Sequence, residues 1–317
     1  MKRLGYAALV FLLIAALSGC GGFQGGPADM PQSAHEVQDG QGKTLKLPHK
    51  PQRIASLSIG TDEVLVHLVA PERIAALTYL ADDPGISNIT AQAQSIATKV
   101  RANPEQLIAL QPDLLLVPDW QPQELIDTLR QAGLPVYVYH APNTIEQIKQ
   151  MIGELSRVVG EEAAGQQLIA GMDSELAAVR QQVDRVAPDK RLIVLQFSLL
   201  GATGGTGSLF DDICKYAGVR NGGAIAGLGK FDLMSKEQMI KVNPDVLIMP
   251  MWDSTGRNNI GQYREKVRSD PGLQSVKAVK NDRLIPVPDR FQSSASHYIV
   301  DGVREVARAA YPELDWQ

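Results

Sequence analysis

Residues 103–118 read NPEQLIALQPDLLLVP, and this stretch decides the fold because positions 235–250 repeat it as SKEQMIKVNPDVLIMP. Seven of the sixteen aligned positions are identical. Each copy opens with an Asn or Ser that suits a helix cap, continues with a short amphipathic run, and ends in an apolar run after Pro-Asp. Each copy therefore predicts a capped helix followed by a buried strand.

Strand-like and helix-like segments alternate on both sides of the two copies. One set begins at Arg53 and another follows residue 190, with apolar runs such as IASLS, VYVY, RLIVLQF and RLIPV. Strands that are apolar throughout and separated by helices are typical of parallel sheets covered on both faces. The sequence thus predicts an α/β fold of two lobes, each with a mainly parallel sheet.

A helical stretch separates the two sets. One helix is expected over residues 144–159, ended by Gly160, and a second over residues 161–186, with apolar residues at three- and four-residue spacing. At 1.5 Å per residue the second helix would be about 39 Å long, enough to reach from one lobe to the other. We expect this one long helix to join the lobes stiffly and to limit their closure.

The N-terminus carries a secretory signal. Lys2 and Arg3 precede an apolar run that leads into Leu-Ser-Gly-Cys at positions 17–20. This tetrapeptide resembles a bacterial lipobox, which implies that Cys20 becomes the lipidated first residue of the mature protein. The residues after it are rich in Gly, Gln, Pro and Asp and predict a flexible tether. The expected divisions are a lipoprotein signal peptide (1–19), a tether (20–50), an N-terminal lobe (51–142), a helical segment (143–188) and a C-terminal lobe (189–317).

Composition and motifs argue against several functions. The formal net charge is −4, and loss of the two signal-peptide cations makes it −6 (−4 minus 2), which disfavours a nucleic-acid partner. The glycine-rich stretches 201–208 and 222–231 do not match a phosphate-binding loop. The five histidines show no metal-ligand spacing, and no nucleophile motif is present. We expect a protein that is not an enzyme, with no cofactor and no directly bound metal.

The lipobox, the tether, the two lobes and the long helix together resemble a known family: the helical-backbone (class III) substrate-binding proteins of ABC importers for ferric siderophores, haem and cobalamin. The resemblance runs from about Arg53 to Tyr311 and includes GGTGSLFDDICKYAGV and DPGLQSVKAVKNDRLIPVP besides the repeat. It implies a monomeric lipoprotein on the periplasmic side or outer face of the cell membrane. Such a protein hands a small metal chelate to a permease dimer with its ATPase subunits.

The ligand is expected between the lobes, because α/β sheets bind ligands beyond the carboxyl ends of their strands. Trp120 and Trp252 each come two positions after the proline that ends a copy of the repeat. Lys99 and Arg101, just before the first repeated helix, suit an anionic ligand such as the carboxylates or catecholates of a ferric siderophore. Three further residues follow other strands and are expected to contact the ligand: Tyr79, Arg290 and Phe291.

Glu105 and Glu237 stand at the second helical position of the two copies. The cap residue and the glutamine three positions later are expected to form a capping box in each copy, which leaves the glutamates free of that box. The helix dipole favours an acidic residue there but does not require glutamate. In the family that the chain resembles, one glutamate on each lobe docks into arginine pockets of the two permease subunits. The resemblance therefore assigns this role to Glu105 and Glu237.

Three alternatives stay open. The cargo of the same kind of protein would instead be cobalamin or another corrinoid. A protein of a different class would be an extracytoplasmic enzyme that uses His140 or His297 in the cleft. A third alternative is a binder of zinc or manganese ions, which would need several converging histidines and carboxylates.

Overall fold

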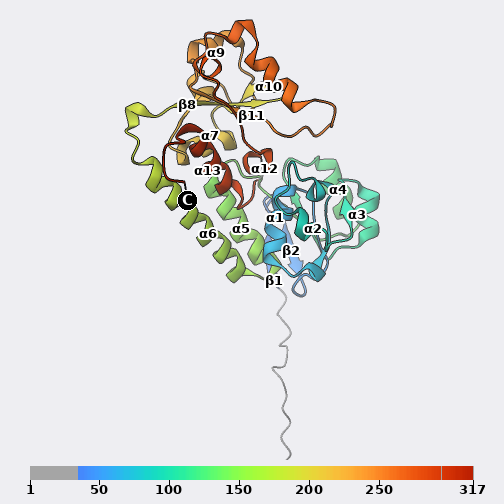
Figure 1. Ribbon diagram of the computed structural model, residues 1–317. Coiled ribbons are helices and arrows are strands. Elements are labelled where there is room, and N and C mark those ends of the chain that lie inside the picture. The colour runs from blue at the N-terminus through green and yellow to red at the C-terminus, as the bar shows by residue number, and fades with distance from the viewer. Residues whose placement is uncertain (1–34, 294, 317) are drawn as a thin grey trace, which may run out of the picture. The chain divides into compact units, whose positions relative to one another are not determined.

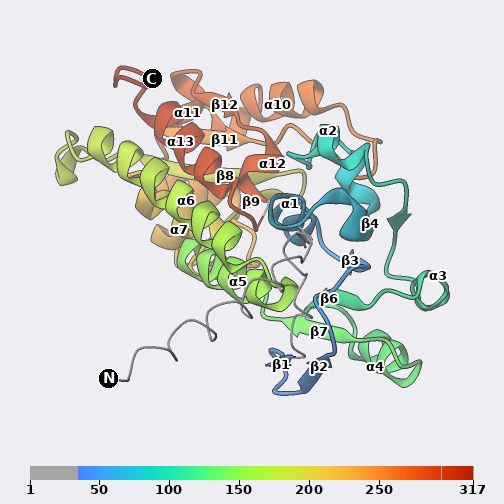
Figure 2. The ribbon, with the colours of Figure 1, turned by 90° about the horizontal axis from the view of Figure 1, so that it is seen from below.

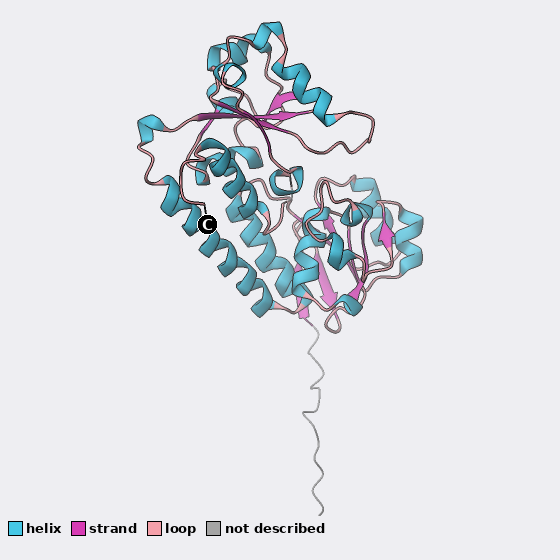
Figure 3. Ribbon diagram, in the orientation of Figure 1, coloured by secondary structure: helices cyan, strands magenta, loops and turns pink. Residues whose placement is uncertain are grey.

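The computed structural model describes residues 35–293 and 295–316. The predicted signal peptide, Cys20 and the first part of the predicted tether lie outside the described residues. The described part contains two five-stranded sheets and one two-stranded hairpin, with helices around the sheets (Figures 1 and 3). Among the described residues, no helix combines the length and the apolar character needed to cross a membrane.

The sheet of the N-terminal lobe has the strand order β5-β4-β3-β6-β7, and every neighbouring pair is parallel. Because β3 lies at its centre, the chain winds outward first to one side and then to the other. The strands are β3 (Ile54–Ser56), β4 (Ile74–Thr78), β5 (Lys99–Val100), β6 (Leu114–Pro118) and β7 (Val136–Tyr139). The helices between them are α1 (Ile59–Leu68), η1 (Pro71–Arg73), η2 (Tyr79–Asp82), α2 (Thr90–Ala93), α3 (Pro104–Leu110) and α4 (Gln123–Gln131).

The sheet of the C-terminal lobe has the order β10-β8-β11-β12, all parallel, with β9 added to β8 in the antiparallel sense. Its strands are β8 (Ile193–Ser198), β9 (Gly201–Thr203), β10 (Arg220–Asn221), β11 (Val246–Met249) and β12 (Leu284–Pro286). Its helices are η3 (Pro188–Lys190), α7 (Leu209–Tyr216), α8 (Gly222–Ile225), α9 (Lys236–Val242), α10 (Ile260–Arg268), η4 (Pro271–Leu273), α11 (Lys277–Lys280), α12 (Asp289–Gln292) and α13 (Ile299–Ala310). The predicted fold class, two α/β lobes with mainly parallel sheets, is confirmed.

Two helices, α5 (Ile145–Val159) and α6 (Glu162–Val183), follow the first sheet. Thr144 caps α5, and Gly160 ends it in the left-handed conformation with φ 74°. Helix α6 has 22 residues and is about 33 Å long, shorter than predicted because the turn toward Pro188 begins at Asp184. It lies alongside α5 and contacts both α1 of the first lobe and α13 of the second (Figures 1 and 2).

The inner faces of the two sheets share one hydrophobic core. Val64 of α1, Met172 of α6 and Val303 of α13 all belong to the same cluster of buried side chains. The outer face of each sheet has a separate cluster, around Leu115 in the first lobe and Leu247 in the second. The lobes are therefore tied by continuous apolar burial as well as by the long helix.

The tether prediction is wrong for its last part. Residues 35–47 form an antiparallel hairpin, β1 (His35–Gln38) with β2 (Thr44–Leu47), and Leu47 is only 2% exposed. At the tip, Asp39 accepts a hydrogen bond from Arg130 of α4 (2.5 Å), and Gly40 N–H donates to the Val138 carbonyl of β7 (2.6 Å). The tether prediction rested on the average composition of residues 20–50, which does not reveal a short strand pair. Contacts with the N-terminal lobe stabilise this pair.

Candidate functional site

The carboxyl edge of the first sheet carries a row of exposed side chains. Tyr79 follows β4 and is 45% exposed, and Trp120 follows β6 and is 62% exposed. The Arg101 guanidinium, just after β5, lies 3.5 Å from the centroid of the Tyr79 ring. Such a cation–π contact holds the guanidinium without neutralising its charge. The strand order therefore brings three of the predicted ligand residues to one edge.

Lys99 is not available to a ligand in the way that we predicted. Its ammonium group donates to the carbonyls of Ala93 (3.0 Å) and Ile96 (2.8 Å), and it pairs with the Asp82 carboxylate (3.2 Å). An ammonium has three donors, and all three are occupied. The side chain is only 17% exposed. Through these contacts Lys99 holds together the chain segments at this end of the sheet.

The carboxyl edge of the second sheet contacts the first lobe directly. Trp252 donates from Nε1 to the Asp83 carboxylate (2.9 Å), and a Cβ on Gly85 would lie 2.0 Å from Trp252 Cδ1. Only glycine permits this packing. Arg290 donates to the Pro84 carbonyl (3.1 Å) and lies 4.9 Å from the centroid of the Phe291 ring. Trp252 and Arg290 thus bridge the lobes rather than line an open surface.

The start of α1 also meets the second lobe. Glu63 accepts from Ser296 Oγ (2.5 Å) and from Asn88 N–H (2.8 Å), and Asn88 Nδ2 donates to the Arg290 carbonyl (2.9 Å). Gly60 lies so close to the Ala295 carbonyl that a Cβ would be 2.8 Å from its oxygen. This line of polar contacts positions the two carboxyl edges against each other.

The sequence analysis missed four exposed apolar side chains in loops of the second lobe. They are Leu200 (82% exposed), Phe231 (84%), Leu233 (52%) and Met251 (49%). Lys230 lies 4.8 Å from the centroid of the Phe231 ring. The signal was present, because the first three stand within or beside the glycine-rich segments that we compared only with phosphate-binding loops. Large apolar residues in such loops are unusual unless something covers them.

Two ionisable groups with shifted pKa values lie at α1, Asp62 within the helix and His297 packed against His67 near its end. Burial raises the pKa of Asp62 in α1 to about 8, although Thr78 donates both its N–H (3.0 Å) and its hydroxyl (2.5 Å) to Asp62 Oδ2. Burial, together with the neighbouring His67, lowers the pKa of His297 to about 3. Asp62 is therefore neutral in the folded state below about pH 8, and His297 is a neutral packing residue at physiological pH.

The two histidines of the enzyme alternative do not form a catalytic set. His140 is exposed and its Nδ1 lies 3.0 Å from the Asp119 carboxylate. The His297 ring packs against His67 with centroids 4.6 Å apart. Neither is hydrogen-bonded to a serine, threonine or cysteine among the described residues, which is what nucleophilic catalysis would need. The same residues contain no group of three or more His, Cys, Asp and Glu that could hold a metal ion.

The repeated helices are equivalent in structure. In α9, Ser235 and Gln238 form the predicted reciprocal capping box. In α3, Asn103 accepts from Gln106 N–H (2.8 Å), but the Gln106 side chain bonds Arg101 N–H and the Lys99 carbonyl instead of the cap (both 3.3 Å). The box prediction is therefore wrong for the first copy, since the chain before Asn103 offers better-placed partners. Both glutamates at the second helical position are exposed.

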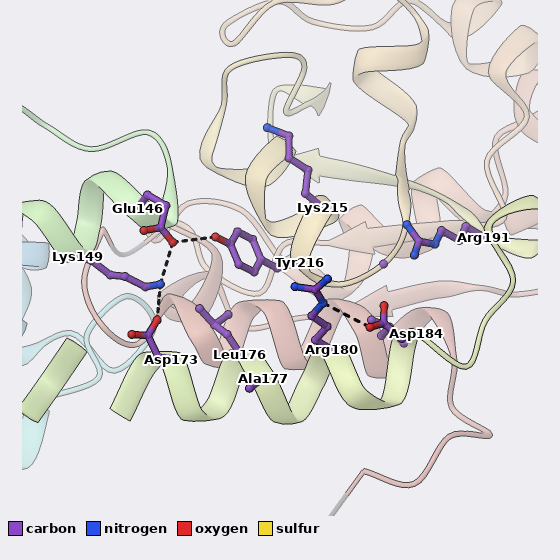
Figure 4. Close-up of a pocket in the computed structure, with 12 residues that line it drawn as sticks. Glu146, Lys149, Asp173, Leu176, Ala177, Arg180, Asp184, Arg191, Lys215 and Tyr216 are labelled. Carbon is purple, nitrogen blue, oxygen red and sulfur yellow. Dashed lines mark hydrogen bonds and ion pairs between the residues drawn. The ribbon is translucent and has the colours of Figure 1, made fainter. Parts of the chain in front are cut away.

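A cavity of about 520 Å³ lies along α6 and is also lined by Lys215 and Tyr216 of α7 (Figure 4). At one end, Lys149 pairs with Glu146 (2.8 Å) and Asp173 (2.5 Å). At the other end, Arg180 pairs with Asp184 (3.4 Å). Most of its charges satisfy one another, so the cavity adds no clear ligand chemistry to the site.

Two α/β lobes on a shared helical core, with aromatic and cationic side chains where the carboxyl edges meet, define a substrate-binding protein. The model of the periplasmic binding protein family matches residues 54–291, and the chain belongs to this family. It is a substrate-binding protein of an ABC transporter, in the group whose members bind iron chelates, haem or cobalamin, and the family acts outside the cytoplasm.

Three comparisons illustrate the relationship. The chain is 21% identical over 327 residues to the uncharacterized ABC transporter substrate-binding lipoprotein YvrC of Bacillus subtilis, with 98% of each chain covered. It is 26% identical over 204 residues to the iron(3+)-hydroxamate-binding protein FhuD of the same organism, with 62% of this chain and 61% of that protein covered. Among solved structures, the molybdate-bound protein MolA of Haemophilus influenzae superposes with a TM-score of 0.73 at 19% identity, covering 88% of this chain and 92% of that one.

Proposed function

We propose that the protein captures a ferric-siderophore-type metal chelate between its lobes and delivers it to an ABC permease dimer with its ATPase subunits. It acts as a monomer, is not an enzyme, and is anchored to the membrane through lipid on Cys20. Ligand contacts come from Tyr79, Arg101, Trp120 and Phe291, with the bridging residues Trp252 and Arg290 beside them.

One observation carries the cargo proposal: Arg101 stacks on the exposed Tyr79 ring. Among the described residues, no carboxylate lies within ion-pair distance of its guanidinium. An unneutralised guanidinium on an exposed aromatic ring suits a ligand with anionic groups on a large, partly apolar body. Trp120 in the first lobe and Phe231 in the second add exposed aromatic rings. The iron-hydroxamate relative supports this cargo.

The cargo is tested by titrating the purified protein with a ferric hydroxamate, a ferric catecholate, haem and cobalamin while tryptophan fluorescence is recorded. We expect one ferric siderophore to quench the fluorescence of Trp120. Arg101→Gln should weaken its binding about tenfold or more, because a charge-assisted contact is lost. The control is Arg220→Gln, an exposed arginine at the start of β10. Tight binding of cobalamin with no response to any siderophore would assign the corrinoid cargo instead.

Two further variants test the partners. Glu105→Ala with Glu237→Ala should leave melting and siderophore affinity unchanged and abolish uptake, because the carboxylates act only on the permease. Cys20→Ser should leave the precursor unprocessed or release the protein from the membrane, since two acyl chains are needed for stable anchoring. Wild-type uptake in the first variant, or unchanged lipid labelling in the second, would contradict the corresponding part of the proposal.

A further inference from the structure

Five of the seven identical pairs in the repeat have a role inside the chain. Asp113 accepts from the N–H groups of Gln52 (2.7 Å) and Arg53 (2.8 Å), and Asp245 accepts from Ile193 N–H (2.9 Å), so each aspartate holds the start of the neighbouring strand. The glutamines bond backbone groups near their helix starts, as described above. The remaining three pairs are buried: Pro112 and Pro244, Leu115 and Leu247, Pro118 and Pro250.

The other two pairs have no such role, apart from the local contacts of the Glu237 carboxyl with its own N–H and with Ser235. Glu105 and Glu237 are exposed, and neither carboxylate forms an ion pair with another described residue. Ile108 is 36% exposed and Ile240 is 43% exposed, although the residue just before each of them is buried. A fold that needed only an amphipathic helix would accept a polar side chain at these positions.

The glutamate and the isoleucine of each copy stand on one side of their helix. Residues three apart are neighbours on a helix surface, so each isoleucine side chain lies beside the glutamate one turn earlier. The positions around them differ between the copies, with Pro104 against Lys236 and Ala109 against Lys241. Among the positions that are exposed in both copies of the repeat, only the glutamate and the isoleucine are identical.

We propose that Ile108 and Ile240 are docking residues, and that each exposed Glu–Ile pair forms a mixed acidic and apolar patch that fits one of two equivalent sites on the permease. The proposal rests on the docking role proposed above for Glu105 and Glu237. The partner must then offer an apolar surface next to each cationic group. Two equal patches on two lobes complement a partner made of two equal chains.

The isoleucines strengthen the ionic contacts in a definite way. An apolar side chain packed beside a carboxylate–guanidinium pair excludes water and lowers the local dielectric constant. Burial of the exposed part of each isoleucine should contribute about three- to eightfold in affinity. Replacement of both should therefore weaken docking about ten- to sixtyfold.

The test compares Ile108→Gln with Ile240→Gln, singly and together, with Ile108→Leu plus Ile240→Leu as the conservative variant. Glutamine keeps high helix propensity and removes the apolar contact. The matched control is Ile225→Gln, which changes an isoleucine that is 44% exposed but lies on neither helix. Binding of each full-length protein to the permease–ATPase complex in nanodiscs is measured, together with melting and affinity for a ferric hydroxamate.

The proposal expects similar losses from the two single glutamine variants, a larger loss from the double variant, and near-normal docking for the leucine variant and the control. Melting and hydroxamate affinity should not change. If Glu105→Ala with Glu237→Ala abolishes docking while the double glutamine variant docks normally, the isoleucine proposal is overturned and the proposed function stands. If neither pair of substitutions affects docking, the docking role of the repeat fails as a whole.

Discussion

The two copies of the repeat solve the same local problem with different bonds. Both helices end in a left-handed residue, Gln111 with φ 49° and Asn243 with φ 53°, before the Pro-Asp that leads into the strand. Yet α9 closes its own capping box, whereas Gln106 joins α3 to the chain around β5. The internal bonds differ while the exposed Glu–Ile pair is the same. The bonds that start each helix therefore come from other residues, and neither helix needs the exposed glutamate and isoleucine in order to form.

The lobes differ in the same way at their first helices. Ser58 caps α1 and Ser208 caps α7, and an aspartate stands four residues after each cap. Asp62 accepts from Thr78 at Oδ2 and its Oδ1 has no hydrogen-bond partner among the described residues, whereas Asp212 accepts from Ile145 N–H (2.8 Å) and pairs with Lys215 (3.3 Å). The aspartates at equivalent positions after the two caps therefore differ: Asp62 is a neutral acid and Asp212 is a paired carboxylate.

The largest expected effect on stability tests that difference. A carboxyl group whose pKa is raised to about 8 holds a proton that the unfolded chain releases above about pH 4, so it costs stability as pH rises toward 8. Asp62→Asn should raise the free energy of unfolding by on the order of 3 kcal/mol at pH 8 and by almost nothing at pH 4. Asp212→Asn should show no such gain. Melting curves from pH 4 to 8.5 check this, and a gain independent of pH would show that Asp62 is charged in the folded protein.

The next effect compares the strand-holding aspartates. Asp113→Ala removes two hydrogen bonds to backbone N–H groups, and Asp245→Ala removes one together with a weak pairing to Lys277 (3.3 Å). We expect losses of about 2–4 kcal/mol and about 1–3 kcal/mol in the free energy of unfolding. Urea denaturation measures both. Equal losses, or a larger one for Asp245, would mean that the count of backbone bonds does not set the cost.

A smaller effect should separate the two glutamines. Gln106→Ala removes bonds to two residues outside α3, and Gln238→Ala removes only the return bond of a cap. We expect about 1 kcal/mol for the first and about 0.5 kcal/mol for the second, since both sites are solvated. Hydrogen exchange should also speed up at Arg101 N–H in the first variant alone. Unchanged exchange there would remove the proposed link between α3 and β5.

The smallest stability effect belongs to the glutamates. Glu105→Gln and Glu237→Gln keep the side-chain shape and remove the charge, so melting should stay within the error of the measurement. The backbone N–H of Glu237 itself, with Ser235, lowers the pKa of the Glu237 carboxyl, so any loss should be the larger there. Docking to the permease should nevertheless weaken in both. A large drop in melting temperature would show that the glutamates stabilise the fold.

The sequence by itself determined the architecture. Strand and helix periodicity, the repeat, the Thr144 cap and the Gly160 stop are local signals, because they depend on residues within one or two turns of each other. The strand order itself came from the structure, and it places Tyr79, Arg101 and Trp120 on one edge.

Only the tertiary structure decided what the side chains at the lobe contacts do. Trp252 meets Asp83 across 169 residues of sequence, and Lys99, which follows α2, pairs with Asp82 of η2 on the other side of that helix in the chain. The hairpin at 35–47 is ordered because Arg130 and Val138 of the first lobe satisfy its tip. The physical reason is the same in each case. A buried polar group forms hydrogen bonds with the groups that the fold places within about 3 Å of it. Those groups often belong to residues distant in sequence, so their positions depend on how the whole chain packs.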